Sequence, residues 1–249
     1  MIRGILLIKA LLLSILFSLA ACSLFKADPA PDAGFSDNPG AMEDAHSESP
    51  FHRGWASSYW LENNKKYRNI IIAPVNTEHL LKASWWENQN SKTKESLEID
   101  RQNIATFFRE NLIRAYKEDP QSRFVVTDTP GLNTLVLEIA IVELVPAKKY
   151  FNLVSSIGGL FVPGASYVSS LGKGSIAIEG RVRDSQTGIV HVKFADRESD
   201  KSAPINLAAF DWYRGSKQHI QDWAEQLVML GSSEHKLVAA SSPFTLTPW

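Results

Sequence analysis

The sequence has a single cysteine in 249 residues and almost no net charge. One cysteine cannot form an intramolecular disulfide, and it cannot supply a multi-cysteine zinc or iron–sulfur site. The 26 basic residues nearly balance the 27 acidic ones, so the basic excess that nucleic-acid binding normally requires is absent. Hydrophobic residues make up 44% of the chain, which excludes a collagen-like or wholly disordered protein and allows a buried core.

Residues 1–21 have the pattern of a secretory signal peptide. Arg3 and Lys9 supply a positively charged start, and the uncharged apolar stretch that follows runs from Ala10 to Phe17. This stretch is shorter than the ~20 apolar residues that a membrane-spanning helix needs. Small residues then lead directly into the only cysteine of the chain, Cys22.

The segment Leu19-Ala20-Ala21-Cys22 resembles the bacterial lipobox. In proteins with this motif the cysteine thiol receives a diacylglyceryl group, the chain is cleaved just before it, and the new amine is acylated, for example with palmitate. The resemblance implies that Cys22 carries acyl chains that anchor the protein to a membrane, because two or more such chains give stable anchoring. Cleavage removes two basic residues and no acidic one, which leaves a formal charge of −3.

The residue that follows Cys22 indicates the destination of the protein. It is Ser23 and not aspartate. In enteric-type bacteria this resembles the pattern for export to the outer membrane, whereas aspartate favours retention at the inner membrane. We therefore expect a periplasm-facing protein that is lipid-anchored to the outer membrane.

Residues 22–54 have the composition of a disordered linker. Prolines and glycines are frequent, small and acidic residues fill most of the rest, and the phenylalanines Phe25, Phe35 and Phe51 stand alone. Such a segment cannot bury enough apolar surface to offset the entropy that ordering costs. We predict a flexible tether with an r.m.s. reach of roughly 30 Å, followed by one domain at 55–231 and a C-terminal tail at 232–249.

Hydrophobic periodicity predicts the elements of that domain. Short apolar or alternating runs indicate strands, and apolar residues at spacings of three and four indicate helices. The expected elements, in chain order, are a strand at 69–76, a helix at 97–117, strands at 123–127 and 134–145, a hairpin at 175–183 and 190–195, and a helix at 216–230 capped by Gly231. This order predicts an α+β fold with helices on one face of a mixed, mainly antiparallel sheet, in which only the first two strands are parallel.

Several of these segments together resemble one known family. They are Phe124-Val-Val-Thr-Asp-Thr-Pro-Gly131, the long strand that ends at Val145-Pro-Ala, the final helix with Trp223, and above all Ser175-Ile-Ala-Ile-Glu-Gly-Arg-Val-Arg-Asp-Ser-Gln-Thr-Gly188. The chain resembles the bacterial lipoprotein family known as domain of unknown function 3313 from about Tyr67 to Leu230. The resemblance implies a compartment and a fold, and it supplies no catalytic residues.

We find no constellation of residues that indicates catalysis. The six histidines have no metal-ligand spacing, and His191 and His219 are predicted to lie on the surface. Glu138 and Glu143 are five residues apart on a strand, so we place them on opposite faces, unsuited to act as an acid and base pair. Gly172-Lys173-Gly174 fails the phosphate-loop pattern. We expect no enzyme activity, no cofactor and no metal.

Two segments are candidates for contact with a partner. Residues 150–172 carry no charge but are interrupted by glycine, proline and serine, so they either fold over the sheet or expose an apolar patch. In the exposed case Leu160, Phe161, Val162 and Tyr167 would contact a protein or the membrane. Trp85 and Trp86, in a polar stretch, are candidates for the same role, whereas Trp212 and Trp223 are predicted core residues.

The sequence therefore leaves two functions of different classes open. The first is a non-enzymatic protein-binding or envelope-assembly module, whose anchor raises its effective concentration near membrane partners. The alternative is a carrier of a small apolar or lipid-like ligand, with a pocket beneath residues 150–172. A closed apolar cavity would favour the carrier, and an exposed apolar patch without a cavity would favour the binding module.

Overall fold

The computed structural model describes 29–30, 32–37, 42–44, 49–80, 91–145, 174–199 and 213–232. The expected signal peptide, Cys22, the Trp85-Trp86 pair, Trp212, segment 150–172 and the tail after Ser232 lie outside the described residues. Among the described residues, no helix is both long and apolar enough to cross a bilayer.

A seven-stranded sheet forms the centre of the fold, in the order β1-β2-β7-β6-β5-β3-β4. The strands are β1 (Glu43–Asp44), β2 (Arg53–Ala56), β3 (Asn69–Ile72), β4 (Val125–Val126), β5 (Thr134–Val145), β6 (Ser175–Asp184) and β7 (Val190–Ser199). The helices are α2 (Ser58–Asn63), the 3-10 turn η3 (Asn64–Lys66), α4 (Ser91–Glu118) and α7 (Arg214–Ser232). The predicted α+β class is confirmed.

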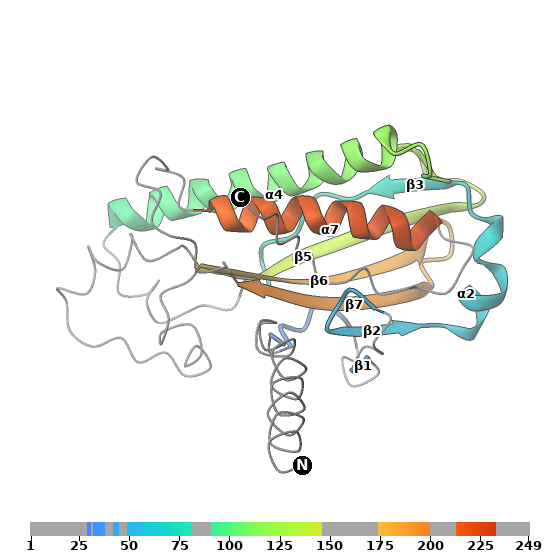
Figure 1. The fold of residues 1–249 in the computed structure, drawn as a ribbon, viewed down its shortest axis with the longest axis horizontal. Helices are drawn as coiled ribbons and strands as arrows, with labels where there is room; N and C mark the ends of the chain where they lie inside the picture. Colours follow the sequence, from blue (N-terminus) through green and yellow to red (C-terminus); the bar gives the residue numbers. More distant parts are fainter. Residues whose placement is uncertain are drawn as a thin grey trace, which may run out of the picture.

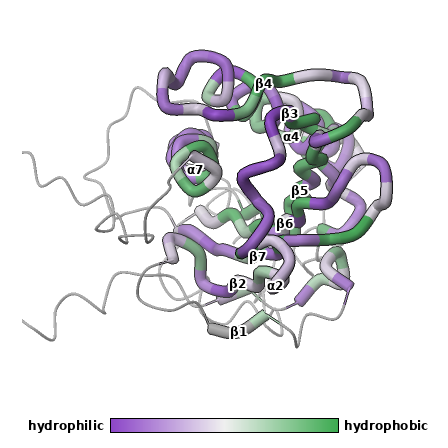
Figure 2. The backbone as a smooth tube through the Cα atoms, turned by 90° about the vertical axis from the view of Figure 1, so that its right-hand side faces the viewer, coloured by the Kyte–Doolittle hydropathy of each residue, from purple (hydrophilic) through white to green (hydrophobic). Residues whose placement is uncertain are grey.

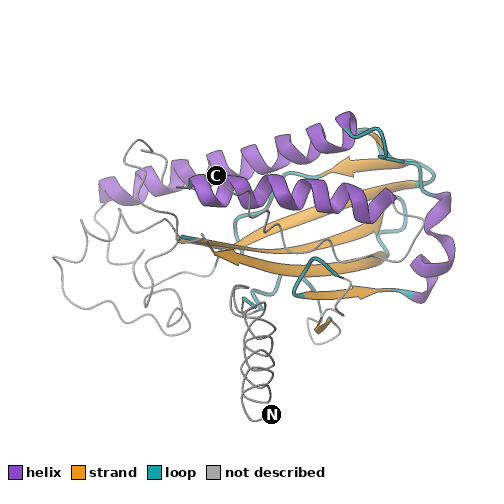
Figure 3. Ribbon diagram, in the orientation of Figure 1, coloured by secondary structure: helices purple, strands orange, loops and turns teal. Residues whose placement is uncertain are grey.

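Helices α4 and α7 lie side by side on one face of the sheet, as predicted (Figures 1 and 3). Their apolar stripes meet the inward side chains of β5 and β6 in a single core. Trp223 of α7 is 1% exposed and stacks on Phe108 of α4 with ring centroids 6.0 Å apart, so its predicted place in the core is confirmed. The short helix α2 begins where the hydroxyl of Ser57 accepts a hydrogen bond from the Trp60 amide.

The sheet is mixed, and its parallel part is larger than the sequence predicted. β3 and β4 are parallel, as expected, but β5 is also parallel to β3. The reason is that residues 127–133 lead the chain back to the end where β3 begins, and Asn133 there adopts a left-handed conformation with φ of 55°. Its carbonyl accepts hydrogen bonds from the amides of Arg68 and Asn69. The four other strand pairings are antiparallel.

A β-bulge corrects the predicted faces of β5. Between Ile141 and Glu143 the register with β6 shifts by one residue, so Glu143 pairs with Ala177. A bulge of one residue reverses the alternation beyond it. Glu138 and Glu143 therefore lie on the same face, the one opposite the helices, and not on opposite faces as their spacing predicted.

The predicted disordered linker at 22–54 is wrong for its described residues. Residues 43–44 and 53–54 form strands at the sheet edge, and β2 pairs with β7 along its whole length. Met42 is 6% exposed, and Phe51 is 4% exposed and stacks on Phe194 with centroids 4.6 Å apart. The isolated phenylalanine thus completes a core that the rest of the domain supplies, which composition alone does not reveal.

Two helix boundaries also differ from the prediction. α4 begins six residues earlier than expected, at Ser91, and α7 extends to Ser232. Gly231 is therefore part of the helix and does not cap it. A Cβ at this position would lie 2.8 Å from Cε2 of Phe124, so the glycine allows α7 to approach that ring.

Gly180 on β6 is the tightest such position and gives a stability prediction. A Cβ there would lie 2.1 Å from Cζ of Phe194, which is itself held by Phe51. We expect Gly180→Ala to lower the free energy of unfolding by about 1–3 kcal/mol, the usual cost of overpacking a core. Urea denaturation of the chain from Ser23 onward measures it.

Gly54 in β2 provides the matched control. A Cβ at Gly54 would meet its nearest atom at 3.8 Å, which is an ordinary contact. Gly54→Ala should change the stability by less than about 0.5 kcal/mol, and Phe194→Leu should restore part of the loss in Gly180→Ala. Equal stabilities of the two alanine variants would contradict the packing argument.

Candidate functional site

The face of the sheet opposite the helices is covered by a segment of the N-terminal chain, which we call the strap. It consists of residues 29–30 and 32–37, drawn in blue beneath the sheet in Figure 1. Small side chains of the sheet leave room for it. Ala140, Val142 and Ala177 form a buried apolar surface, and the strap packs Ala30, Ala33 and Phe35 against it.

Glu179 of β6 holds the centre of the strap. Its side chain is 1% exposed, and its two carboxylate oxygens accept hydrogen bonds from the backbone amides of Ala33, at 2.7 Å, and Ser36, at 3.0 Å. An ionised carboxylate is costly to bury unless it is hydrogen-bonded. The strap therefore satisfies a group that the sheet alone would leave without these donors.

Basic side chains of the sheet hold the second half of the strap. Arg181 donates to the Phe35 carbonyl at 3.4 Å, pairs with Asp37 at 3.5 Å, and lies 4.9 Å from the centre of the Phe35 ring. Lys193 of β7 donates to the Asp37 carbonyl. Hydrogen bonds from charged donors are stronger than neutral ones, and the two basic side chains belong to the sheet. They therefore hold the strap carbonyls at defined positions on the sheet.

Glu138 of β5 positions the arginines. It accepts hydrogen bonds from Arg181 at 2.6 Å and from Arg183 at 2.9 Å. Partial burial alone would raise the pKa of Glu138, but the two arginine hydrogen bonds outweigh it and hold the pKa below the usual range. The carboxylate thus stays ionised and keeps the Arg181 guanidinium aimed at the strap.

The strap turns at Gly34, whose φ is +80°. The Gly34 amide donates to the Asp32 carboxylate at 2.9 Å, which closes the turn locally. Only glycine adopts this conformation without strain. The turn brings the Ala33 and Ser36 amides to the same carboxylate.

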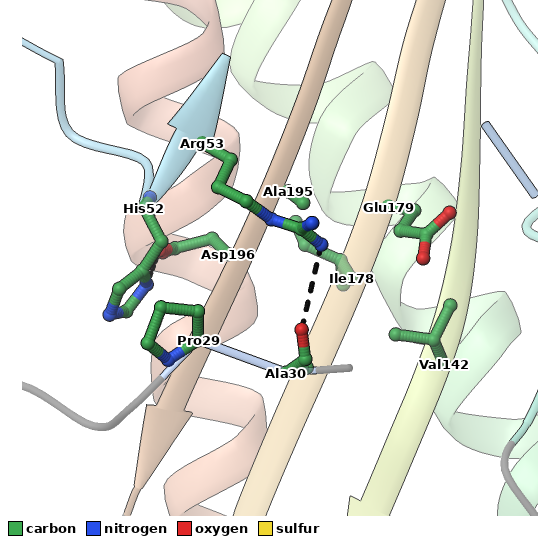
Figure 4. A pocket seen from close by; sticks show the side chains of 9 residues that line it. All are labelled: Pro29, Ala30, His52, Arg53, Val142, Ile178, Glu179, Ala195 and Asp196. Carbon is green, nitrogen blue, oxygen red and sulfur yellow. Dashed lines mark hydrogen bonds and ion pairs between the residues drawn. The ribbon is translucent and has the colours of Figure 1, made fainter. Parts of the chain in front are cut away.

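A small pocket lies where the strap begins, at Pro29 and Ala30 (Figure 4). Arg53 donates to the Ala30 carbonyl at 3.5 Å, shown as the dashed line. The space between the labelled side chains is too small to hold a water molecule. This pocket is therefore a contact of the strap and not a site for a ligand.

Asp196 of β7, which lines this pocket, is buried and hydrogen-bonded within the fold. It accepts hydrogen bonds from the Trp223 indole at 2.7 Å and from the backbone amide of His52 at 3.0 Å, and it also contacts the His52 ring. It ties α7 and the residues before β2 to the sheet.

His191 and His219 are buried, which corrects their predicted surface positions. His219 is 8% exposed and His191 is 3% exposed. The register of β6 with β7 shifts between Val182 and Arg183, and His191 lies under α2 against the rings of Tyr59 and Trp60. Neither the shift nor α2 was predicted from the sequence.

The hydrogen bonds of Tyr67 indicate which nitrogen of the neutral His191 ring carries the proton. The Tyr67 hydroxyl lies 2.9 Å from both Asp184 and His191 Nε2. A hydroxyl has one proton, which goes to the carboxylate, so Nε2 carries the proton of the neutral imidazole. The Nδ1 atom of His191 is buried without a partner.

The electrostatics of this cluster follow from burial. Burial, and then the hydrogen bond to Asp184, raise the pKa of Tyr67 to about 12. Burial also lowers the pKa of His191 below its ordinary value of 6.5, since a second proton would sit on the unpartnered Nδ1. The cluster holds α2 against the sheet through the rings of Tyr59, Trp60 and His191.

One end of the molecule exposes apolar side chains. Seven large hydrophobic residues are exposed among those described, and five of them lie at the end where β3, β4 and β5 begin: Tyr59, Leu61, Val125, Leu132 and Ile189. The strand register places Val125 and Thr134 beside Asn69, and Ser185 donates its amide to the Thr134 carbonyl. Figure 2 looks at this end and shows a green, hydrophobic stretch at β4. We call these five residues the apolar end.

None of the predicted contact or lipidation residues can be placed. Cys22, Trp85, Trp86 and the four candidates in 150–172 lie outside the described residues. Sequence reasoning missed the strap, although one signal was present: Glu179 lies on the same strand face as Ala177, and small neighbours beside a lone acid leave room for a chain segment. No group of three or more His, Cys, Asp or Glu side chains among the described residues could hold a metal ion.

His191 gives a pH prediction. A histidine whose folded pKa is lowered stabilises the fold fully above its unfolded pKa of about 6.5 and loses that contribution as the pH falls below it. We expect the stability difference between the native chain and His191→Gln to shrink from pH 7.5 to pH 5.0, by at most about 1.4 kcal/mol per pH unit. Urea denaturation at each pH measures this, and a difference that stays constant over the range would contradict it.

Comparisons with known proteins place the chain in a family without assigning an activity. A search of curated proteins gives no match. Two solved structures are similar in part. The PelC dodecamer from Paraburkholderia phytofirmans has 8% identity and a TM-score of 0.35, and 68% of this chain covers 91% of that one. The hypothetical protein CT253 from Chlamydia trachomatis has 11% identity and a TM-score of 0.30, with 66% and 89% covered.

Neither likeness is close enough to carry an argument about function. The family model described as protein of unknown function (DUF3313) matches residues 53–227, which include β2 to β7 and most of α7. The Glu179-Gly180-Arg181 stretch that carried the resemblance in the sequence lies in this region, and its roles are to hold the strap and to admit the Phe194 ring. The chain therefore belongs to the DUF3313 family.

Proposed function

We propose that this protein is a lipoprotein of the bacterial cell envelope, anchored to the outer membrane by acyl chains on Cys22, and that its domain binds another envelope protein without catalysing a reaction. The lipobox supports the anchor, and Ser23 supports the outer membrane. Within the described residues, the two buried carboxylates have structural partners: Glu179 accepts hydrogen bonds from strap amides, and Asp196 accepts one from the Trp223 indole. These contacts support a structural role for both groups.

The apolar end carries the protein-binding part of this proposal. Exposed hydrophobic side chains are ordinary when scattered singly, but clusters mark interaction sites. Here Leu61 is 68%, Leu132 is 77% and Ile189 is 59% exposed, and they come from three separate parts of the chain. The partner is a protein with a complementary apolar surface, which would bury these side chains as the centre of the interface.

The anchor is tested by changing Cys22. Cys22→Ser removes the thiol that accepts the diacylglyceryl group, so we expect loss of labelling by an alkyne fatty acid and release of the protein from membranes. Ser23→Asp is the matched control, because it keeps the thiol and changes only the sorting residue. It should remain labelled and shift to the inner membrane when the membranes are separated by density.

The anchor would be contradicted if the Cys22→Ser protein were still labelled by the fatty acid. It would also be contradicted if the mature native chain began at a residue other than Cys22, which the intact mass of the protein extracted from membranes measures directly. An unshifted Ser23→Asp variant would contradict only the outer-membrane assignment.

The apolar end is tested by cross-linking in cells. A photo-reactive amino acid at Leu61 should give a discrete adduct with one envelope protein, identified by mass spectrometry. The pair Leu132→Asp and Ile189→Asp should abolish the adduct, since losing central apolar contacts costs about 2 kcal/mol or more, equivalent to roughly 30-fold in affinity. The matched control is Ile99→Asp, an equally exposed residue at the other end of α4.

The result against this proposal would be an adduct that survives the paired substitution, or that Ile99→Asp removes equally. Because all three residues are exposed, the variants should fold, and circular dichroism checks this. Phe161→Asp in the same assay decides whether segment 150–172 contributes to the contact.

A further inference from the structure

We infer that the strap turns the sheet face opposite α4 and α7, here called the open face because neither of these helices covers it, toward the bilayer. The strap also holds the domain within about 25 Å of the bilayer, so that the lipid surface is the neighbour of this face and a protein partner approaches from elsewhere. The inference rests on the proposed anchor at Cys22. It follows from where the chain is first held after that residue, and from the geometry of the fold.

The strap is held by bonds from three strands. Glu179 of β6 accepts the amides of Ala33 and Ser36, Arg181 donates to the Phe35 carbonyl, and Lys193 of β7 donates to the Asp37 carbonyl. Arg53 of β2 adds a bond to the Ala30 carbonyl. Pro29, in contact with the sheet at the pocket of Figure 4, is therefore the first described point of attachment after Cys22.

The distance available between anchor and attachment is short. Pro29 is seven residues beyond Cys22, and seven residues span at most about 25 Å when fully extended. Without the strap, the next buried residue is Met42, twenty residues beyond Cys22. That length spans up to about 70 Å, so the strap shortens the tether to roughly a third.

So short a tether also restricts orientation. For the outer surface of α4 and α7 to face the bilayer, the chain would have to cross β2 and β1, about 10 Å at the spacing of strands. It would then have to pass the sheet and helix layers, about 15 Å more. This uses the whole extended length, so the helix layer cannot rest on the membrane, whereas the open face meets it directly.

The apolar end is consistent with this arrangement. It lies at the end of the strands and is not covered by the strap, so it stays accessible at the side of the domain when the open face is turned toward the lipid. The anchor then presents the apolar end along the membrane surface, where another envelope protein can meet it.

The test attaches the chain chemically, so that it does not depend on lipidation in cells. The chain from Cys22 to the C-terminus is coupled through its only thiol to a maleimide lipid in a supported bilayer. Polarised infrared spectroscopy then reports the direction of the helix axes, and neutron reflectometry reports the distance of the protein layer from the headgroups. In the native chain, α4 and α7 should lie parallel to the bilayer, with the layer within about 25 Å.

Two variants release the strap in different ways. Glu179→Gln replaces one acceptor oxygen by an NH2 group, which donates hydrogen bonds and cannot accept one from a strap amide. Gly34→Ala strains the turn at φ +80° without changing any charge. Both should lose the helix orientation and move the layer away from the headgroups. Gly188→Ala is the control, since it strains an equivalent glycine at φ +73° in the β6–β7 turn, far from the strap.

A native chain with randomly oriented helices, or one that the two strap variants leave unchanged, would overturn the inference. Because the coupling is chemical, this result is independent of whether Cys22 is acylated in cells. If the native protein is not labelled by the fatty acid in cells but shows the expected orientation on the supported bilayer, the proposed anchor is contradicted. The role of the strap in orienting the domain is then still supported.

Discussion

A buried carboxylate that needs donors explains how the N-terminal chain is attached to this domain. Glu179 lies on the sheet face opposite α4 and α7, and it is 1% exposed because the strap lies over it. The sheet offers the acceptor, and the strap offers two backbone amides. Without the strap the carboxylate lacks these two donors, and without the carboxylate the two strap amides lack their acceptor. These hydrogen bonds make the segment part of the fold.

The same logic explains the charged residues around it. Arg181 lies between Glu138 and the strap, so one guanidinium serves both the sheet and the segment that covers it. The Glu-Gly-Arg-Val-Arg-Asp stretch therefore has structural roles. Glu179 accepts the strap amides, Gly180 makes room for the Phe194 ring, and Arg181 donates to the strap. Asp184 closes the hairpin turn. In that turn, Asp184 accepts the amides of Gln186 and Thr187, while Gly188 supplies a positive φ.

The sequence predicted the regular core well because its elements carry strong periodicity. The strand at 134–145 and the final helix depend on local patterns of apolar residues, and both were placed within two residues of their observed ends. The parallel pairing of β3 with β5 was missed because it depends on the path of residues 127–133. The burial of His191 and the sheet face of Glu143 were missed because register shifts reverse the alternation on which such predictions rely.

The candidate site was the least predictable part because it is assembled from segments that are far apart. Ala33 and Glu179 are 146 residues apart in the chain, and the strap on its own has the composition of a linker. A segment of this kind becomes ordered only when an existing surface supplies its partners, so neither periodicity nor propensity reveals it. The apolar end is similar, since Leu61, Leu132 and Ile189 lie far apart in the chain and reach the same end of the sheet only in the fold.

The most direct measurement is backbone amide exchange in the strap, followed by NMR on the chain from Ser23 onward. If Glu179 accepts the Ala33 and Ser36 amides, both should exchange about 100-fold more slowly than in an unstructured peptide, which corresponds to a local opening free energy of about 2.7 kcal/mol. Glu179→Gln should speed the exchange of both without affecting the amides of β5. Exchange at the rate of an unstructured peptide in the native chain would contradict the account.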